Sequence, residues 1–122
     1  MKSLSQIQTE EMRRCLLVVL MESGSALRAK TVRSVMDNMN HSTSWGDFLS
    51  QCDYLAGEEL IRVFPGEADQ ELTDVEQAKF LAVCKRTTFD SPDADKIMIR
   101  IRQRGRQFME GNDDSVKGVA KS

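Results

Sequence analysis

The segment DYLAGEELIRVF, residues 53–64, contains the transition from helix to strand on which the fold depends. Its first half continues an apolar pattern of helical period, and its second half is a run of strand-forming residues ended by a Pro-Gly pair. Upstream, Ser44 with Asp47 predicts the start of this helix, which should extend to about Glu58. The segment therefore predicts a helix that passes directly into a strand over residues 60–64. The side chains expected in the core from this helix are Phe48, Leu49, Cys52, Leu55 and Ala56.

A second strand is expected far downstream, over residues 96–101. Its sequence, KIMIRI, alternates, so that one face carries three isoleucines and the other carries Met98 and Arg100. The residues between the two strands, 66–95, are far more than a hairpin turn needs. Within them a capping box predicts an extra helix. The residues of that box and of the expected apolar side are Thr73, Glu76, Val75, Ala78, Leu81 and Ala82.

Two helices are expected before residue 44. The first should start near Ser5, with Gln8 three residues later, and end at the sequence ESG; the second should extend from about Ala29 to Met39. Their apolar stripes are Met12, Leu16, Val19 and Leu20 in the first and Val32, Val35, Met36 and Met39 in the second. At the other end of the chain, residues 112–122 carry too little apolar surface to fold and are expected to be a flexible tail.

This order of elements resembles the winged helix-turn-helix, in which two short helices cross and a β-hairpin packs on their edge. Residues 53–64 are similar to the third-helix signature of that family, and IRQRGRQFMEG, residues 101–111, is similar to its strand-to-helix closure. The order and spacing also resemble small winged-helix proteins encoded in Mu-like prophages. The resemblance covers roughly residues 10–111 and implies an α+β, mainly helical domain, which we assign to residues 1–111 and whose wing is enlarged by a partly helical insertion at 66–95.

Two positions depart from the pattern of that family. Glu59 stands where the family usually has a glycine in left-handed conformation, and the glycine of this chain is at position 57. Either the helix ends one turn earlier, or Glu59 takes a positive φ at a cost of about 1 kcal/mol. In addition, Arg102 replaces the threonine that caps the last helix. Both departures concern the boundaries of elements and leave the fold class unchanged.

Composition limits the classes of function. Seventeen basic and nineteen acidic residues give a formal charge of −2, so attraction to DNA or to a membrane would need an uneven distribution of charge. The three separated cysteines lie in apolar stretches and fit reduced, buried thiols of a cytosolic protein. The longest apolar run, residues 15–21, is too short to cross a bilayer. We expect a cytoplasmic protein without membrane contact.

The predicted third helix, residues 44–58, contains no Lys or Arg and carries three carboxylates. In DNA-binding winged helices this element enters the major groove, where carboxylates would face phosphates and oppose binding. Positive charge instead gathers at the start of the second helix and along the second strand, where winged helices contact the sugar-phosphate backbone. The candidate DNA-binding residues are Arg28, Lys30, Arg33, Ser50, Gln51, Lys96, Arg100 and Arg102.

Four arginines at every second position from 100 to 106 suggest a cationic ribbon. If Gly105 belongs to the closing helix, only Arg100 lies on the strand, and Arg104 and Arg106 lie about 200° apart on the helix. We therefore expect the row to be broken near Arg102.

We expect no cofactor, no metal site and no catalysis. The single histidine, His41, has no nucleophile beside it in a recognisable motif, and the cysteines lack metal-ligand spacing. The carboxylates of the insertion lack the order of a calcium loop and are expected to form a solvated acidic segment, which could instead dock on a basic partner. These carboxylates are Glu67, Asp69, Glu71, Asp74 and Glu76. Trp45 is expected to pack over the adjoining turn rather than stack on a base.

Two hypotheses of function follow. The first is a non-enzymatic winged-helix protein of phage or prophage type that contacts double-stranded DNA mainly through its backbone, in a regulatory or DNA-packaging accessory role. The second is a protein–protein interaction module that uses the winged helix only as a scaffold, as a dimer or with another phage or host protein. The fold resemblance places the first slightly ahead, whereas the acidic third helix and the inserted helix favour the second.

Overall fold

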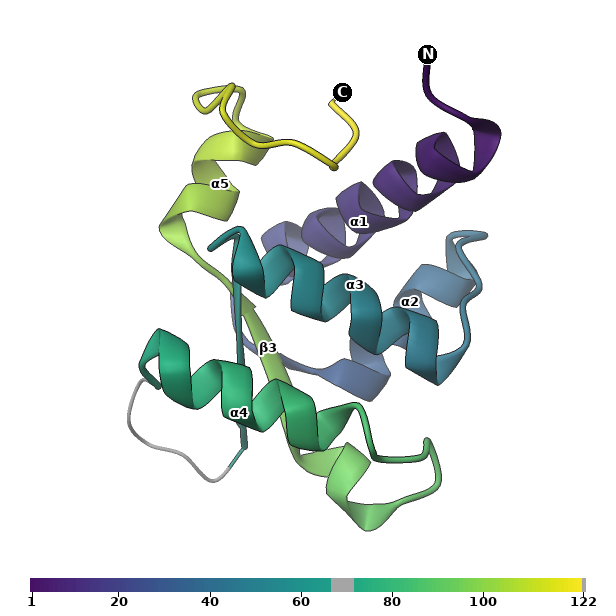
Figure 1. The fold of residues 1–122 in the computed structure, drawn as a ribbon, viewed down its shortest axis with the longest axis vertical. Helices are drawn as coiled ribbons and strands as arrows, with labels where there is room; N and C mark the ends of the chain where they lie inside the picture. The colour runs from purple at the N-terminus through teal and green to yellow at the C-terminus, as the bar shows by residue number, and fades with distance from the viewer. Residues whose placement is uncertain (67–71, 122) are drawn as a thin grey trace.

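The fold is α+β and mainly helical, with a small antiparallel sheet (Figure 1). The computed structural model describes residues 1–66 and 72–121. In chain order the elements are α1 (Leu4–Ser23), β1 (Leu27–Arg28), α2 (Ala29–Asn38), α3 (Trp45–Gly57), β2 (Ile61–Pro65), α4 (Asp74–Cys84), the 3₁₀ helix η1 (Pro92–Lys96), β3 (Ile97–Ile101) and α5 (Gln103–Met109).

The sheet has the strand order β1-β3-β2, so β3 is central and pairs with both neighbours. Ile61 of β2 faces Ile101 of β3, and Val63 faces Ile99. Because these side chains are buried and alternate with less buried ones along β3, the sheet has an inner, apolar face and an outer face. The alternation predicted for residues 97–101 is confirmed. Strand β1 was not predicted; it has only two residues and pairs through Leu27 with Ile99.

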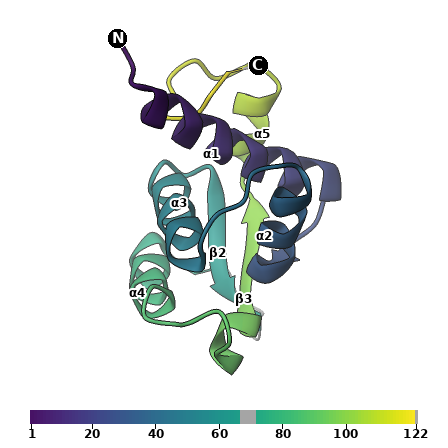
Figure 2. The same cartoon turned by 90° about the vertical axis from the view of Figure 1, so that its right-hand side faces the viewer.

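Helices α1, α2 and α3 provide the core that lies on the inner face (Figure 2). The predicted inward side chains of α3, from Phe48 to Ala56, are all buried, and Ser44 caps this helix by accepting the Asp47 N–H. In α2, half of the predicted apolar stripe is wrong. Val32 and Met36 are fully buried, but Val35 and Met39 are exposed, because the inner face of this helix is completed by Ala29.

Capping boxes begin two of the helices. At α1 the Ser3 hydroxyl accepts the Gln6 N–H, and the Gln6 side chain accepts the Ser3 N–H. The helix therefore begins at Leu4, and the predicted start near Ser5 was slightly too late. At α4, Thr73 accepts the Glu76 N–H and the Glu76 carboxylate accepts the Thr73 N–H, so the predicted start of the inserted helix is confirmed.

Helix α4 lies against the free edge of β2, and its orientation differs from the predicted one. Val75, Ala78 and Ala82 are exposed, and only Leu81 of the expected apolar side is buried. The inward side is formed instead by Gln77, Leu81 and Cys84. The Gln77 Oε1 accepts the Val63 N–H at 2.8 Å, so this helix satisfies a backbone donor of the edge strand. Glu67, Asp69 and Glu71 of the predicted acidic segment lie outside the described residues.

Close packing joins the start of α5 to the connection between α3 and β2. Arg102 donates its backbone N–H to the Leu60 carbonyl oxygen at 2.9 Å, and Gly105 lies directly against the same carbonyl. A Cβ at position 105 would collide with the Leu60 oxygen and with the Ile101 side chain. Gly105 belongs to the closing helix, which is the condition under which the arginine row was expected to break.

The C-terminal segment, residues 112–121, packs along α1 and passes near the ends of α3 and α5 (Figure 1). The expectation that it has too little apolar surface to pack is wrong. Val116 and Val119 are 3% and 4% exposed, and the Ala120 N–H donates to the Glu10 carbonyl oxygen at 3.0 Å. Two buried valines and side-chain bonds to its carbonyl groups hold a segment that contains no regular helix or strand.

Within residues 1–66 and 72–121, no helix has both the length and the apolar character needed to cross a membrane.

Candidate nucleic-acid interface

The outer face of the sheet brings together cations from all three strands. The register places Arg62 of β2 opposite Arg100 of β3, and it places Arg28 of β1 opposite Met98. Since side chains two residues apart on a strand share a face, Arg28, Arg62 and Arg100 project on the same side, away from the isoleucine core. Arg62 was not predicted as a site residue, because an arginine inside a short strand gives no indication of what lies opposite.

The two cations at the start of α2 are held by neighbouring groups. Lys30 forms an ion pair with Asp95 at 2.9 Å and lies over the Phe89 ring, 4.5 Å from its centroid. The hydrogen bond from Lys30, together with its charge and that of Arg28, lowers the pKa of Asp95 below its usual value. Arg33 donates from Nε to the Thr43 carbonyl oxygen at 3.0 Å. These cations therefore serve partly as structural contacts.

At the other end of β3, two arginines share one carboxylate. Asp74, at the first position of α4, lies 3.0 Å from Nη1 of Arg62 and 3.6 Å from Nη1 of Arg102. The Arg62 side chain is only 5% exposed, whereas that of Asp74 is 68% exposed. Arg62 Nε and Arg102 Nη1 are buried, and neither has a hydrogen-bond partner among the described residues. We name Arg62, Asp74 and Arg102 the arginine–aspartate cluster.

The candidate base-contacting residues of α3 lie apart from these cations. Ser50 is exposed and donates to the Gly46 carbonyl oxygen of its own helix, while the Gln51 Oε1 accepts from Arg13 Nε at 2.6 Å. Helix α3 belongs to the inner side of the sheet, and its Asp53 pairs with Lys85 from the end of α4. Ser50 and Gln51 therefore lie apart from the arginines of the outer face. The candidate DNA-binding residues predicted from the sequence do not form a single interface.

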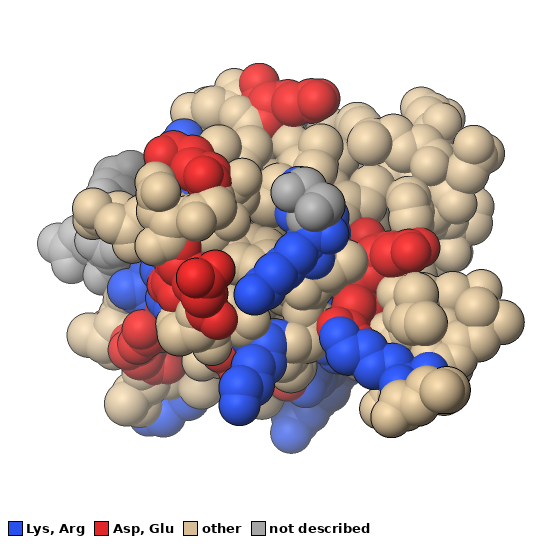
Figure 3. Space-filling view, turned by 90° about the horizontal axis from the view of Figure 1, so that it is seen from above, with Lys and Arg blue, Asp and Glu red and all other residues tan. Residues whose placement is uncertain are grey.

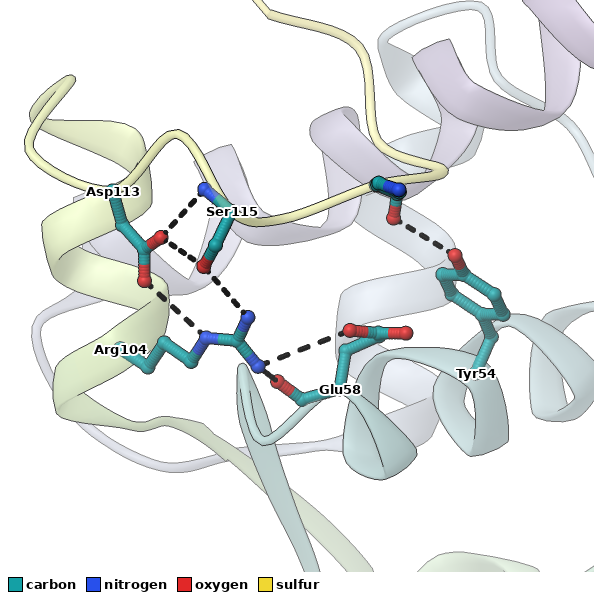
Figure 4. A network of polar contacts seen from close by, with 6 residues as sticks. Tyr54, Glu58, Arg104, Asp113 and Ser115 are labelled. Carbon is teal, nitrogen blue, oxygen red and sulfur yellow. Dashed lines mark hydrogen bonds and ion pairs between the residues drawn. The ribbon is translucent and has the colours of Figure 1, made fainter.

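Arg104 belongs to a polar network at the C-terminal segment and not to a cationic row. It contacts Glu58 at its carbonyl oxygen and carboxylate, and it also binds Asp113 and Ser115 (Figure 4). Both the side-chain and backbone bonds from Ser115, followed by Arg104, lower the pKa of Asp113. Nearby, the Tyr54 hydroxyl donates to the Lys117 carbonyl oxygen at 2.8 Å. The predicted break in the arginine row is thus present in the structure.

Basic and acidic side chains are interspersed on the end of the molecule formed by α1, α5 and the C-terminal segment (Figure 3). Arg13 is stacked on Tyr54, 3.6 Å from the ring centroid, and its Nη1 donates to the Gly118 carbonyl oxygen at 2.8 Å. Arg14 donates to the Ala120 carbonyl oxygen at 3.2 Å. The mixture of charges and these internal contacts make this end a poor surface for a phosphate backbone.

Lys96 and Arg100 lie at the two ends of the central strand. Lys96 is exposed at the end of η1, where its carbonyl oxygen accepts the Gly66 N–H at 2.7 Å. Arg100 is half-buried in β3. Both cations therefore adjoin the outer face that carries Arg28 and Arg62.

A groove lies between α1 and the end of α2. It has a volume of about 280 Å³ and is mostly apolar. Its lining residues are Glu11, Arg14, Cys15, Val18, Met39 and His41. Met39 is 40% exposed at its rim, and Val35, one turn earlier on α2, is 36% exposed.

Trp45 is buried and packs in the core. The Trp45 ring is 7% exposed, stacks on Phe48, and donates from Nε1 to Thr87 Oγ1 at 3.2 Å, so the packing role expected for it is confirmed.

Cys15, Cys52 and Cys84 are buried as free thiols. Burial raises the pKa of all three, and that of Cys84 reaches about 11. Within residues 1–66 and 72–121, no three His, Cys, Asp or Glu side chains are grouped as metal ligands.

The sequence predicted Lys30 as a site residue, but it did not predict Arg62 or the counterions of these two cations. Asp95 and Asp74 come from the insertion, and their sequence positions give no indication that they reach Lys30 and Arg62. The place of η1 beside α2 determines the first pair, and the place of α4 beside β2 determines the second.

Among known proteins, no family model, no curated protein and no solved structure matches this chain, so no role is carried over from a relative.

Proposed function

We propose that this chain is a non-enzymatic protein with a winged helix-turn-helix scaffold that binds double-stranded DNA through the outer face of its sheet. The order of helices and strands and the antiparallel sheet are compatible with that scaffold. In this proposal, residues 66–95 are an insertion in the wing, and α4 is its main element. The resemblance to proteins of Mu-like prophages supports a phage setting, with a regulatory or DNA-packaging accessory role.

The observation that carries this proposal is the strand register. It places Arg28, Arg62 and Arg100 on one face, and Lys96 and Arg102 flank the same central strand. A phosphate backbone carries negative charges at regular intervals, and their neutralisation by arginine and lysine releases counterions and provides most of the affinity.

Helix α3 is the less suitable surface, although it is the recognition element of DNA-binding winged helices. Asp47 is exposed in its first turn, and Asp53 is engaged with Lys85 of the inserted segment. Carboxylates on this surface would repel phosphates. Contacts led by the outer face would fix the orientation of DNA but would carry little information about its sequence.

Titration of DNA with charge-matched variants tests the proposal. The double variant Arg28→Gln, Arg100→Gln should weaken binding to a labelled duplex and reduce the slope of log K against log salt by roughly 0.9 for each phosphate that the variant no longer neutralises. The control Lys79→Gln, Arg86→Gln removes the same charge from exposed positions on and after α4 and should change binding much less. Absence of a retarded band for the unmodified chain at low salt would refute the proposal.

The groove between α1 and α2 favours a second candidate function, self-association. Exposed Val35 and Met39 adjoin an apolar hollow whose rim carries both an acidic and a basic residue, Glu11 and Arg14. A two-fold contact over this groove uses the same residues on both copies, and a pairing of Glu11 of one copy with Arg14 of the other would balance their charges. A second copy of this chain is therefore the partner that the groove fits.

Light scattering over a range of concentrations tests this second candidate. The unmodified chain should be a dimer, and Val35→Glu, Met39→Glu should be a monomer with unchanged helix content. Val83→Glu is the matched control, because Val83 is 57% exposed on α4, away from the groove. A chain that stays monomeric at all concentrations would exclude self-association.

A further inference from the structure

The arginine–aspartate cluster combines deep burial with incomplete pairing. The Arg62 side chain is 5% exposed, yet within the described part of the chain its Nε has no acceptor, and Arg102 Nη1 is also buried without one. Both guanidinium groups approach the same carboxylate oxygen, Oδ1 of Asp74. Buried polar groups in proteins are almost always hydrogen-bonded, so two unsatisfied donors at one place indicate a missing acceptor.

Asp74 is a weak counterion for two arginines. It supplies one negative charge, and its contact with Arg102, at 3.6 Å, is too long to be a hydrogen bond. Its side chain is 68% exposed, so the position of the carboxylate is open to solvent, whereas the Arg62 side chain is only 5% exposed and that of Arg102 is 26% exposed. A carboxylate in this position can turn away from the arginines without unpacking the core.

The geometry points to a phosphate-binding site at this cluster, in which a phosphate group takes the place of the Asp74 carboxylate between Arg62 and Arg102. A phosphate has more acceptor oxygens than a carboxylate and pairs well with guanidinium groups. Asp74 is then an exchangeable counterion that keeps the two arginines together when no ligand is present. The inference deepens the proposed function and rests on it for the biological source of the phosphate, because the cluster adjoins the outer face of the sheet.

The chemistry leaves two sources of the phosphate group. A phosphodiester of a nucleic-acid backbone carries one charge, whereas a free phosphate or a terminal phosphate carries up to two. Both present oxygens of the required kind, and binding of each can be measured separately. Inorganic phosphate and dimethyl phosphate are suitable probes for the two sources.

Thermal unfolding of the full chain in phosphate and in chloride, at equal ionic strength and pH 7, tests the site. A ligand that binds the folded state stabilises it in proportion to ln(1 + [L]/Kd) and so raises the midpoint. The unmodified chain should be stabilised specifically by phosphate, and Arg102→Gln should weaken the apparent Kd by roughly tenfold or more, the effect of removing one charge-assisted bond. Asp74→Asn should bind phosphate more tightly, because it removes the competing charge.

Arg106→Gln is the matched control, since Arg106 lies on α5, one turn after Arg102, and makes the same change of charge. It should keep the phosphate effect of the unmodified chain. Arg102 is preferred to Arg62 for substitution because its side chain is 26% exposed and its replacement leaves the core packing intact. If Arg102→Gln is already unfolded before heating, Asp74→Asn tests the site alone. A larger stabilisation by phosphate than in the unmodified chain supports the site, and an equal or smaller one contradicts it.

Equal midpoints in phosphate and chloride for both the unmodified chain and Asp74→Asn would overturn the site, and so would an unchanged phosphate effect in Arg102→Gln. A chain that binds DNA but fails this test retains the proposed function and loses the site. A chain that binds phosphate but not DNA retains the site, and its ligand is then a free or terminal phosphate. Stabilisation by dimethyl phosphate identifies the backbone diester as the source.

Discussion

Glu59 shows how one residue joins α3 to β2. Its φ is +63°, the left-handed conformation, and the Leu60 N–H donates to the Leu55 carbonyl oxygen while the Glu59 N–H donates to that of Ala56. These two bonds form a Schellman motif, whose left-handed position is most often a glycine. Of the two alternatives left by the sequence, the positive φ is therefore the correct one.

Glu59→Gly should raise the free energy of unfolding by up to about 1 kcal/mol, because it removes the left-handed strain at some cost in chain entropy. Glu59→Ala is the control: it removes the same carboxylate but keeps a Cβ, so it should leave stability nearly unchanged. Urea unfolding measures both. A gain of equal size in the alanine variant would show that the charge, and not the backbone conformation, is responsible.

Two glycines in helices should respond oppositely to alanine. A Cβ at Gly105 would meet the Leu60 carbonyl oxygen, whereas a Cβ at Gly57 would meet no atom within 4 Å. Gly105→Ala should destabilise the fold by about 2–3 kcal/mol through overpacking, and Gly57→Ala should stabilise it by about 0.5–1 kcal/mol. Urea unfolding of both variants tests this pair, and equal effects would contradict the packing described at the start of α5.

At the scale of elements, α4 acts as a cover for the edge of β2. Gln77→Leu should cost about 1–3 kcal/mol, because the buried Val63 N–H loses its acceptor at Gln77 Oε1. Lys79→Leu, at an exposed position of the same helix, should change stability by less than about 0.5 kcal/mol. Hydrogen exchange of the Val63 amide is the specific measurement, and it should accelerate only in the Gln77 variant.

Sequence reasoning succeeded for elements whose signals are local. Ser44 and Thr73 cap helices through bonds to residues three positions away, and the isoleucines of β3 alternate within five residues. It failed where the partner is distant. Strand β1 is too short to show a period, and Gln77 points inward only because the edge of β2 offers a donor.

The same distinction applies to the candidate site. The cations of α2 and β3 could be identified by residue type, but Arg62 and its unsatisfied Nε become meaningful only when the register is known. The C-terminal segment was misjudged because two valines are a weak signal of packing. They are sufficient here because Arg13, Arg14 and Tyr54 bind the carbonyl groups of the segment.

At the scale of the whole molecule, acid should weaken the fold. Hydrogen bonds from Ser115 lower the pKa of Asp113, those from Thr73 lower the pKa of Glu76, and that from Lys30 lowers the pKa of Asp95. A carboxyl whose pKa is lower in the folded state stabilises the fold above its unfolded pKa, about 4. That stability is lost as the pH falls through the lowered folded value.

Urea unfolding at pH 7, 5 and 3 should therefore show little change between the first two values and a clear loss at the third. Asp113→Asn should be less stable than the unmodified chain at pH 7, and the difference should shrink toward pH 3, because the stabilisation by the ionised Asp113 diminishes below its unfolded pKa. A difference that stays constant across the three values would show that the charge of Asp113 does not hold the C-terminal segment.

The three buried thiols lie on three different helices: Cys15 on α1, Cys52 on α3, and Cys84 at the end of α4, where it is close enough to Cys52 to interact with it. Because burial raises their pKa, alkylating reagents should modify each one only after its surroundings open. The order in which mass spectrometry detects the labels would then reveal whether α4 separates before the core formed by α1, α2 and α3 opens. The native sequence thus already contains reporters for this question, and no foreign probe needs to be attached.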